Sequence, residues 1–217
     1  MDNEKILTRL EEVYEQATPR NFTQSVDLVF SLKDLNLNDP DEKVDTFVTL
    51  PEPLVEKQRV AAFVGPDLVD KVQPVVDKVV TQSEFDDYAS DSKKAKDLAK
   101  SYDYFMAQAD IMPQVATTFG RYLGPRGKMP NPRMGSVVNP KSDFESLYTR
   151  FQRTVRLRAK KDPIIQVKVG REDMDDEALV KNIKTCYDTV LEALPNHRNN
   201  VKQAYLKLTM SKPVELL

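Results

Sequence analysis

The stretch RVAAFVG, residues 59–65, decides the fold class. It is a short, continuous apolar run that ends in glycine, which is typical of a strand buried in a parallel sheet. After it we predict a helix around Asp67–Gln73, a short strand near Val79–Val80 and a long charged helix from about Ser83 to Lys100. A second apolar run, DYFMAQA at 103–109, comes next. Strands that alternate with helices in this way predict an α/β unit with a parallel sheet.

The N-terminal part of the chain follows a different pattern. Apolar residues recur at helical spacing from Ile6 to Ala17, which predicts an opening amphipathic helix. SVDLVFSLK at 25–33 then alternates between apolar and polar residues like a half-exposed strand. VDTFVTL at 44–50 is its predicted partner, reached through a polar loop that contains Asn-Asp-Pro.

The C-terminal part resembles the N-terminal part in style. TVRLRA at 154–159 and IIQVKVG at 164–170 alternate like a half-exposed hairpin, with its turn at 160–163. We predict a helix from about Asp175 to Leu194 and a final strand at 201–210.

These patterns predict two domains. Residues 1–56 and 154–217 form a split α+β domain from both chain ends. Residues 57–153 form an inserted α/β domain, which a helix from about Ser142 to Arg153 closes. The two strands that cross between the domains lie side by side in this arrangement, so we expect them to form a two-stranded hinge.

The composition is that of an ordinary globular protein, with 40% hydrophobic and 30% charged residues. No apolar run approaches the roughly 20 residues that span a bilayer, and the acidic, amphipathic N-terminus is unlike a secretory signal. The single cysteine, Cys186, excludes an internal disulfide framework. We therefore expect a cytoplasmic protein with no membrane partner.

The net charge of −2 conceals a segregated distribution. Residues 111–161 contain eleven Lys and Arg against two acids, whereas residues 67–110 contain ten acids against six bases. A local anionic partner requires such a basic region. Solvated faces carry charge blocks of this size equally often, so the distribution alone decides nothing.

Metal and catalytic sites find little support. His197 is the only histidine and lies in a polar loop, and Cys186 falls on the apolar face of a helix, so we expect neither a metal nor a catalytic residue. Gly127–Lys128 looks like the end of a phosphate-binding loop, but the glycine spacing is too short and Met129 stands where Ser or Thr is needed. The alternative that stays open is an enzyme whose inserted α/β domain binds a nucleotide.

Three segments fit contact with an anionic polymer. GRYLGPRGKMPNPRMG at 120–135 spaces its basic residues with glycines and prolines, which keep backbone N–H groups accessible. PRNFTQS at 19–25 offers Arg20, the aromatic Phe22 and two hydroxyls, the groups that single-stranded RNA needs for stacking and 2′-OH bonds. KLTMSKP at 207–213 brings Lys207, Thr209 and Lys212 together where a strand ends.

Taken together and in this order, RNFTQS, LGPRGKMPNP and LKLTMSKP resemble the L-one family of large-subunit ribosomal proteins, and most of all its archaeal branch. The resemblance covers essentially the whole chain. It implies a split outer domain with an inserted Rossmann-like domain, and no enzymatic activity or cofactor. It also implies a structural constituent of the large subunit that binds ribosomal RNA at the mobile stalk and assists release of deacylated tRNA from the exit site. Family members also repress translation of their own messenger RNA, and we expect a monomer when the protein is free.

The resemblance also implies an RNA surface on the split domain. Residues that match the family motifs, or stand beside them in the same segments, make up the predicted RNA-binding set: Arg20, Phe22, Thr23, Ser25, Lys168, Gly170, Lys207, Thr209, Met210 and Ser211. A second set, predicted to meet RNA or tRNA or to lie near the cleft between the domains, comes from the inserted domain: Arg121, Gly124, Arg126, Gly127 and Lys128.

One segment departs from the family pattern. The family usually reads Thr-Met-Gly-Pro where this chain has Thr209-Met210-Ser211-Lys212. Glycine permits close approach of the backbone to RNA, whereas serine adds a Cβ. We expect the Ser211 hydroxyl and the Lys212 charge to replace that backbone contact.

Overall fold

The computed structural model describes residues 2–37, 39, 42–54, 56–159 and 162–216. The chain divides into two compact units. The split unit consists of Met1–Val55 and Arg153–Leu217, and the inserted unit consists of Glu56–Gln152. The boundaries expected from sequence lie one residue from these at each junction.

The split unit is built on an antiparallel sheet of four strands in the order β10-β9-β1-β8. Its strands are β1 (Ser25–Leu32), β8 (Ile164–Arg171), β9 (Val201–Leu208) and β10 (Val214–Glu215). Alternate residues of β1 are fully buried, so one face of the sheet packs on the core and the other does not. The half-exposed strand expected at 25–33 is therefore confirmed.

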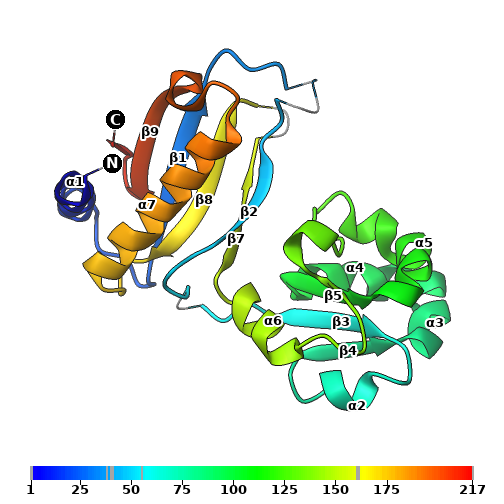
Figure 1. Ribbon diagram of the computed structural model, residues 1–217. Helices are drawn as coiled ribbons and strands as arrows, with labels where there is room; N and C mark the ends of the chain where they lie inside the picture. The colour runs from blue at the N-terminus through cyan, green and yellow to red at the C-terminus, as the bar shows by residue number, and fades with distance from the viewer. Residues whose placement is uncertain (1, 38, 40–41, 55, 160–161, 217) are drawn as a thin grey trace. The chain divides into compact units, whose positions relative to one another are not determined.

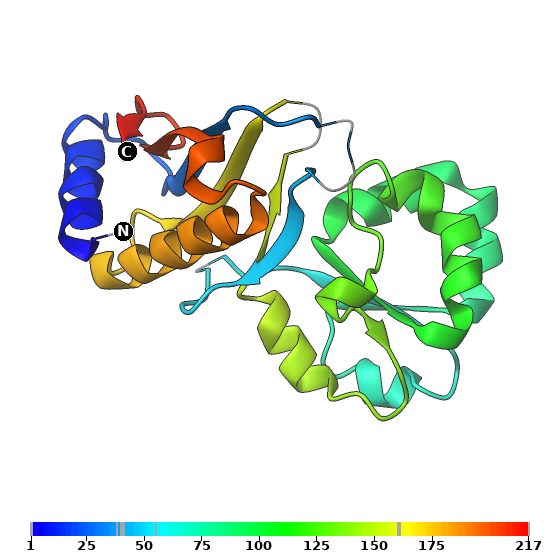
Figure 2. The ribbon, with the colours of Figure 1, turned by 45° about the horizontal axis from the view of Figure 1, so that its top comes forward.

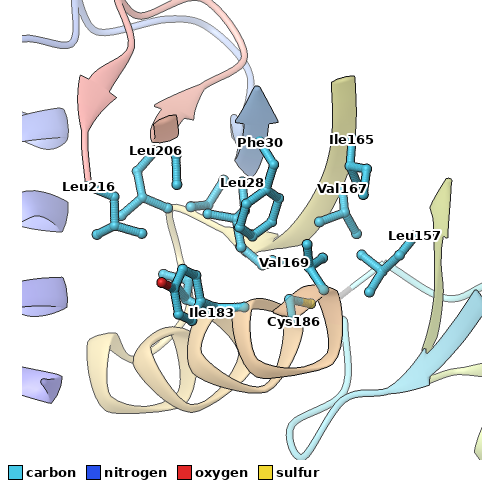
Figure 3. Close-up of a cluster of buried hydrophobic side chains, with 14 of the residues drawn as sticks. Leu28, Phe30, Leu157, Ile165, Val167, Val169, Ile183, Cys186, Leu206 and Leu216 are labelled. Atoms are coloured by element: carbon cyan, nitrogen blue, oxygen red, sulfur yellow. The ribbon is translucent and has the colours of Figure 1, made fainter. Parts of the chain in front are cut away.

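Two helices, α1 (Asn3–Glu15) and α7 (Asp176–Ala193), cover the core face of this sheet. Figure 1 shows α7 lying across the strands, and Figure 2 shows α1 beside the beginning of α7. In Figure 3, Leu28, Phe30 and Val167 of the sheet point toward Ile183 and Cys186 of α7. The apolar period in the sequence predicted both helices because their buried faces are continuous.

The remaining strands of the split unit, β2 (Asp45–Thr49) and β7 (Thr154–Arg158), form a separate two-stranded antiparallel ribbon (Figure 1). The sequence predicted that residues 25–33 pair with 44–50 and that residues 154–159 pair with 164–170. Both pairings are wrong in the described ladders, because β1 pairs with β8 and β9, and β2 pairs with β7. Local alternation identifies a strand but does not choose its neighbour, which is set by long-range packing. The predicted turn at 160–163 includes residues 160 and 161, which lie outside the described residues.

The inserted unit has a parallel sheet in the order β4-β3-β5-β6. Its strands are β3 (Val60–Val64), β4 (Lys78–Thr81), β5 (Tyr104–Gln108) and β6 (Val137–Val138). Every residue of β3 is buried, as a strand covered on both faces requires. The predicted fold class, an α/β protein with an α+β split part and an inserted α/β part, is confirmed.

The helices of the inserted unit surround this sheet. The long helix predicted from Ser83 to Lys100 is wrong in one respect, because it is broken at Asp91. The Asp91 carboxylate accepts bonds from the backbone N–H groups of Lys93 and Lys94 and so begins a new helix. The helices and helical turns not yet named are α2 (Val69–Val72), η1 (Gln82–Glu84), α3 (Phe85–Ser90), α4 (Ser92–Ser101), η2 (Ala109–Ile111), α5 (Met112–Leu123), η3 (Pro132–Met134), α6 (Phe144–Phe151) and, in the split unit, η4 (His197–Asn200).

Candidate nucleic-acid interface

The sheet of the split unit has an open face, which no helix in the described part of that unit covers. Its residues alternate with the buried ones and meet across the strands by register. Asp27 of β1 lies between Lys168 of β8 and Lys207 of β9. One step along, Ser25 lies opposite Arg171 and is bonded to Thr209. The open face therefore carries two rows of polar and basic side chains at the end of the sheet.

Ser25 and Thr209 hold each other in place. The backbone N–H of Thr209 donates to the Ser25 carbonyl at 3.1 Å, and the backbone N–H of Ser25 donates to Thr209 Oγ1 at 3.0 Å. Thr209 is nevertheless exposed. Since its hydroxyl accepts the bond from Ser25, a ligand oxygen is a suitable acceptor for the hydroxyl hydrogen.

A buried glutamine ties three segments together behind this pair. Gln24 is 2% exposed, and its Oε1 accepts from the backbone N–H of Met210 at 3.0 Å. Its backbone N–H donates to Glu172 Oε1 at 2.7 Å, and its side-chain amide donates to Glu172 Oε2 at 3.3 Å. The Gln24 cluster is the name used for these residues: Gln24, Ser25, Glu172, Thr209 and Met210.

Sequence reasoning missed Gln24 and Glu172. A signal for Gln24 was present, because the alternation of β1 extended backward places residue 24 on the buried side, where a polar residue is unusual. A buried amide of this kind needs partners, and here the partners are the other two segments. Glu172 had no such signal, since it lies in an ordinary acidic run.

Two large apolar side chains are exposed at this surface, Met210 of the cluster and the nearby Phe22. Phe22 is 52% exposed and Met210 is 58% exposed. Phe22 precedes Gln24 by two residues, and Met210 is bonded to Gln24 through its backbone. Exposed apolar groups beside hydroxyls provide surfaces on which unstacked nucleobases pack. Arg20 and Thr23 are exposed in the same loop as Phe22.

The turn after β9 uses Ser211 internally. The backbone N–H of Leu208 donates to Ser211 Oγ at 2.8 Å, and that hydroxyl donates to the Lys212 carbonyl at 3.0 Å. The hydroxyl therefore closes the turn that presents Thr209 and Met210. Lys212 is exposed, so its charge faces solvent.

A side chain at position 170 would point into the protein rather than toward the open face. A Cβ at this position would overlap the side chains of Leu179 and Met174. Close packing of β8 against the beginning of α7 accounts for this glycine. Its neighbour Lys168 lies on the open face.

Charges on the open face are partly balanced. Burial raises the pKa of Asp27, while a bond from Gln166 and the charges of Lys207 and Lys168 oppose that rise. Asp27 thus carries a costly negative charge between two lysines.

All members of the second predicted set except Arg121 belong to the turn LGPRGKMP, Leu123–Pro130, which we call the glycine–proline segment. Gly124 ends α5, and Gly127 has φ of 68°, a conformation that favours glycine. Lys128 Nζ donates to the carbonyls of Ala99 and Tyr102 at 3.2 and 2.6 Å, at the end of α4. Burial lowers the pKa of Lys128.

The other two members of this set, Arg121 and Arg126, are exposed. Arg121 belongs to the last turn of α5, and Arg126 Nη1 donates to the Tyr122 carbonyl at 3.0 Å. The stretch GRYLGPRGKMPNPRMG at 120–135 thus begins within α5. Within it, Lys128 faces the protein while the arginines face solvent.

The described residues show no arrangement suited to a metal site or to a reactive thiol. They contain no group of three or more His, Cys, Asp and Glu side chains placed to hold a metal. Cys186 is buried, which raises the pKa of its thiol to about 12, and so it is a core residue. None of the helices described is both long and apolar enough to cross a bilayer.

Comparison with known proteins identifies the class. Residues 13–212 match the Ribosomal protein L1p/L10e family. The chain is 38% identical over 216 residues to "Large ribosomal subunit protein uL1" of Methanothermococcus thermolithotrophicus, covering 100% of this chain and 99% of that protein. It is 36% identical over 215 residues to the protein of the same name from Methanothermobacter thermautotrophicus, covering 99% of each. With the Methanococcus voltae protein it shares 37% identity over 217 residues, 99% of this chain and 100% of the relative.

The chain therefore belongs to the Ribosomal protein L1p/L10e family. It is a large-subunit ribosomal protein with archaeal relatives, and its location is the cytoplasmic ribosome. The resemblance drawn from the three sequence segments is confirmed.

Proposed function

We propose that this protein binds large-subunit ribosomal RNA at the mobile stalk through the Gln24 cluster and the open face beside it. The observation that carries the proposal is the convergence of three distant segments on Gln24, which fixes Ser25, Thr209 and Met210 in one surface. Hydroxyls, backbone groups and exposed apolar side chains together suit irregular RNA. Lys168 and Lys207 add positive charge for the phosphates.

The same surface accounts for a regulatory role. A messenger RNA that mimics the ribosomal site presents the same groups, so the protein represses its own translation by binding it. On the ribosome, the exposed Arg121 and Arg126 of the inserted unit face exit-site tRNA and assist its release. The β2–β7 ribbon is the hinge between the units, and the free protein is a monomer.

The competing function, a nucleotide-binding enzyme, is disfavoured by the residues that occupy one position in the parallel sheet of the inserted unit. Nucleotides bind such sheets at the carboxyl ends of strands where the strand order reverses, here β3 and β5. Gln108 occupies that position, is 5% exposed and accepts from the backbone N–H of Gly65 at 2.8 Å. Asp67 and Asp110 lie 3.4 Å from its amide nitrogen, and their carboxylates repel a phosphate.

Filter binding with a transcript of the stalk region of large-subunit ribosomal RNA tests the proposal. We expect saturable binding that weakens as salt rises, and weaker binding to an unrelated RNA of equal length. Equal affinity for the two RNAs would contradict the proposal. A shift of the unfolding temperature on adding ATP or NAD would instead favour the enzyme.

A further inference from the structure

Arg171 is a basic residue of the open face that the sequence did not single out. It is the last residue of β8 and lies opposite Ser25 in the ladder. Ser25 is bonded to Thr209, so Arg171 extends the row that begins with the exposed hydroxyl. In the sequence it precedes Glu172 and Asp173, and this acidic run hides it.

The guanidinium of Arg171 is incompletely satisfied. Its Nε is buried and has no hydrogen-bond partner among the described residues. Its Nη2 lies 3.3 Å from Asp173 Oδ2, in an ion pair whose side chains are 25% and 45% exposed. A buried donor without an acceptor is unfavourable and rare. The conformation of the free protein is therefore not the one in which this side chain makes its best bonds.

We propose that Arg171 binds a backbone phosphate of the bound RNA, and that Asp173 holds its side chain until RNA arrives. This inference rests on the proposed function. A guanidinium offers two parallel N–H donors that match a phosphate, and the Nε group is one of them. On binding, the side chain turns outward, exchanges Asp173 for the phosphate and gives Nε an acceptor. The neighbouring Ser25 and Thr209 then contact the sugar of the same nucleotide.

The test is filter binding of the full-length variants to the stalk-region transcript across a salt series. For Arg171→Gln we expect affinity to fall about tenfold and the salt slope to fall by about one phosphate contact. Arg171→Lys keeps the charge but lacks the two parallel N–H donors of the guanidinium, so we expect RNA affinity to fall by a similar factor. Asp173→Asn removes the competing carboxylate, and we expect tighter binding.

The control is Arg158→Gln. Arg158 forms a comparable ion pair with Asp45, with Nε 3.5 Å from the carboxylate and side chains 29% and 37% exposed, but it lies on the β2–β7 ribbon. We expect its affinity to stay within about twofold of the wild type. Equal losses for Arg158→Gln and Arg171→Gln would overturn the proposal, because the effect would then be one of net charge. Wild-type affinity of Arg171→Lys would contradict the proposal that the guanidinium binds the phosphate through two parallel N–H donors.

Two outcomes separate the role of Arg171 from the proposed function. If the wild type shows no preference for the stalk transcript, the proposed function is wrong. If the wild type binds and Arg171→Gln binds equally well, only the role of Arg171 is wrong. Thermal unfolding of each variant accompanies the assay, and Arg171→Lys decides the question if Arg171→Gln is unfolded.

Discussion

The glycine–proline segment and the Gln24 cluster differ in a way that the sequence conceals. The glycine–proline segment is basic and conspicuous, yet Lys128 donates inward to two carbonyls and Gly127 serves a tight turn. The Gln24 cluster carries no lysine or arginine, yet it brings three distant segments to one exposed surface. A conspicuous motif can thus serve mainly its own domain, while the surface that we propose for RNA is assembled from residues that look ordinary.

Breaking the centre of the Gln24 cluster has the largest expected effect on RNA binding. Gln24→Ala removes the side-chain amide that bonds the N–H of Met210 and Glu172 Oε2, while the backbone bond to Glu172 Oε1 stays. We expect stalk RNA affinity to fall by about 2–4 kcal/mol. Filter binding measures the loss. Gln82→Ala, which removes an amide from the surface of the inserted unit, is the control and should bind normally. Wild-type affinity of Gln24→Ala would show that the three segments do not act together.

The exposed hydroxyl of Thr209 has the next largest expected effect on RNA binding. Thr209→Ala removes the acceptor of the Ser25 N–H and the donor offered to RNA, so we expect affinity to fall by about 1–3 kcal/mol. Thr209→Ser keeps the hydroxyl and should remain within about twofold of the wild type. Isothermal titration with the stalk transcript separates the two variants. Equal affinities would mean that the hydroxyl makes no contact.

Lys128 tests the other side of the comparison. Lys128→Ala removes two bonds to the end of α4, and we expect the unfolding free energy to fall by about 1–3 kcal/mol with RNA affinity nearly unchanged. Arg126→Ala, on the same turn but exposed, should cost less stability. Urea unfolding measures both. A Lys128 variant that keeps its stability and loses RNA would reverse the roles given to the two regions.

A change at Asp27 has the smallest expected effect on RNA affinity. Burial raises its pKa above the ordinary value of 3.8, so protonation as the pH falls through that raised pKa relieves its charge. Lys168 and Lys207 then lose their counter-charge, and RNA affinity rises toward acid pH. The same sign holds for stability, since a carboxyl with a raised pKa favours the folded state below its usual pKa and loses that contribution as the pH rises through the folded pKa.

We therefore expect Asp27→Asn to bind RNA more tightly at neutral pH, by a factor below about ten. We also expect this variant to lose the acid dependence. The exposed Asp97→Asn serves as the control for the same change in net charge. Binding measured at several pH values decides the point. An unchanged acid dependence in Asp27→Asn would assign it to another group.

Local patterns in the sequence predicted the elements but not their partners. The buried faces of α7 and the alternation of β1 follow from single stretches of chain, and both were found. The pairing of β1 with β8 and β9 joins residues more than a hundred positions apart, which no local pattern encodes. Asp91 divided a predicted helix because its side chain caps backbone N–H groups, an effect stronger than the run of helix-forming residues around it.

The candidate site was predicted only in part. Motif resemblance led to Ser25 and Thr209, which the structure brings together. It could not supply Gln24, whose importance lies in burial, or Arg171, whose unpaired Nε is a property of the folded chain. The inward bonds of Lys128 likewise became visible only in three dimensions.

A residue-resolved NMR titration of the full-length protein with the stalk-region transcript tests directly whether RNA binds at the Gln24 cluster. We expect the largest amide shift changes at Ser25, Thr209 and Met210, while the amides of Gly127 and Lys128 change little. Changes concentrated in the glycine–proline segment, with the Gln24 cluster unaffected, would contradict this expectation.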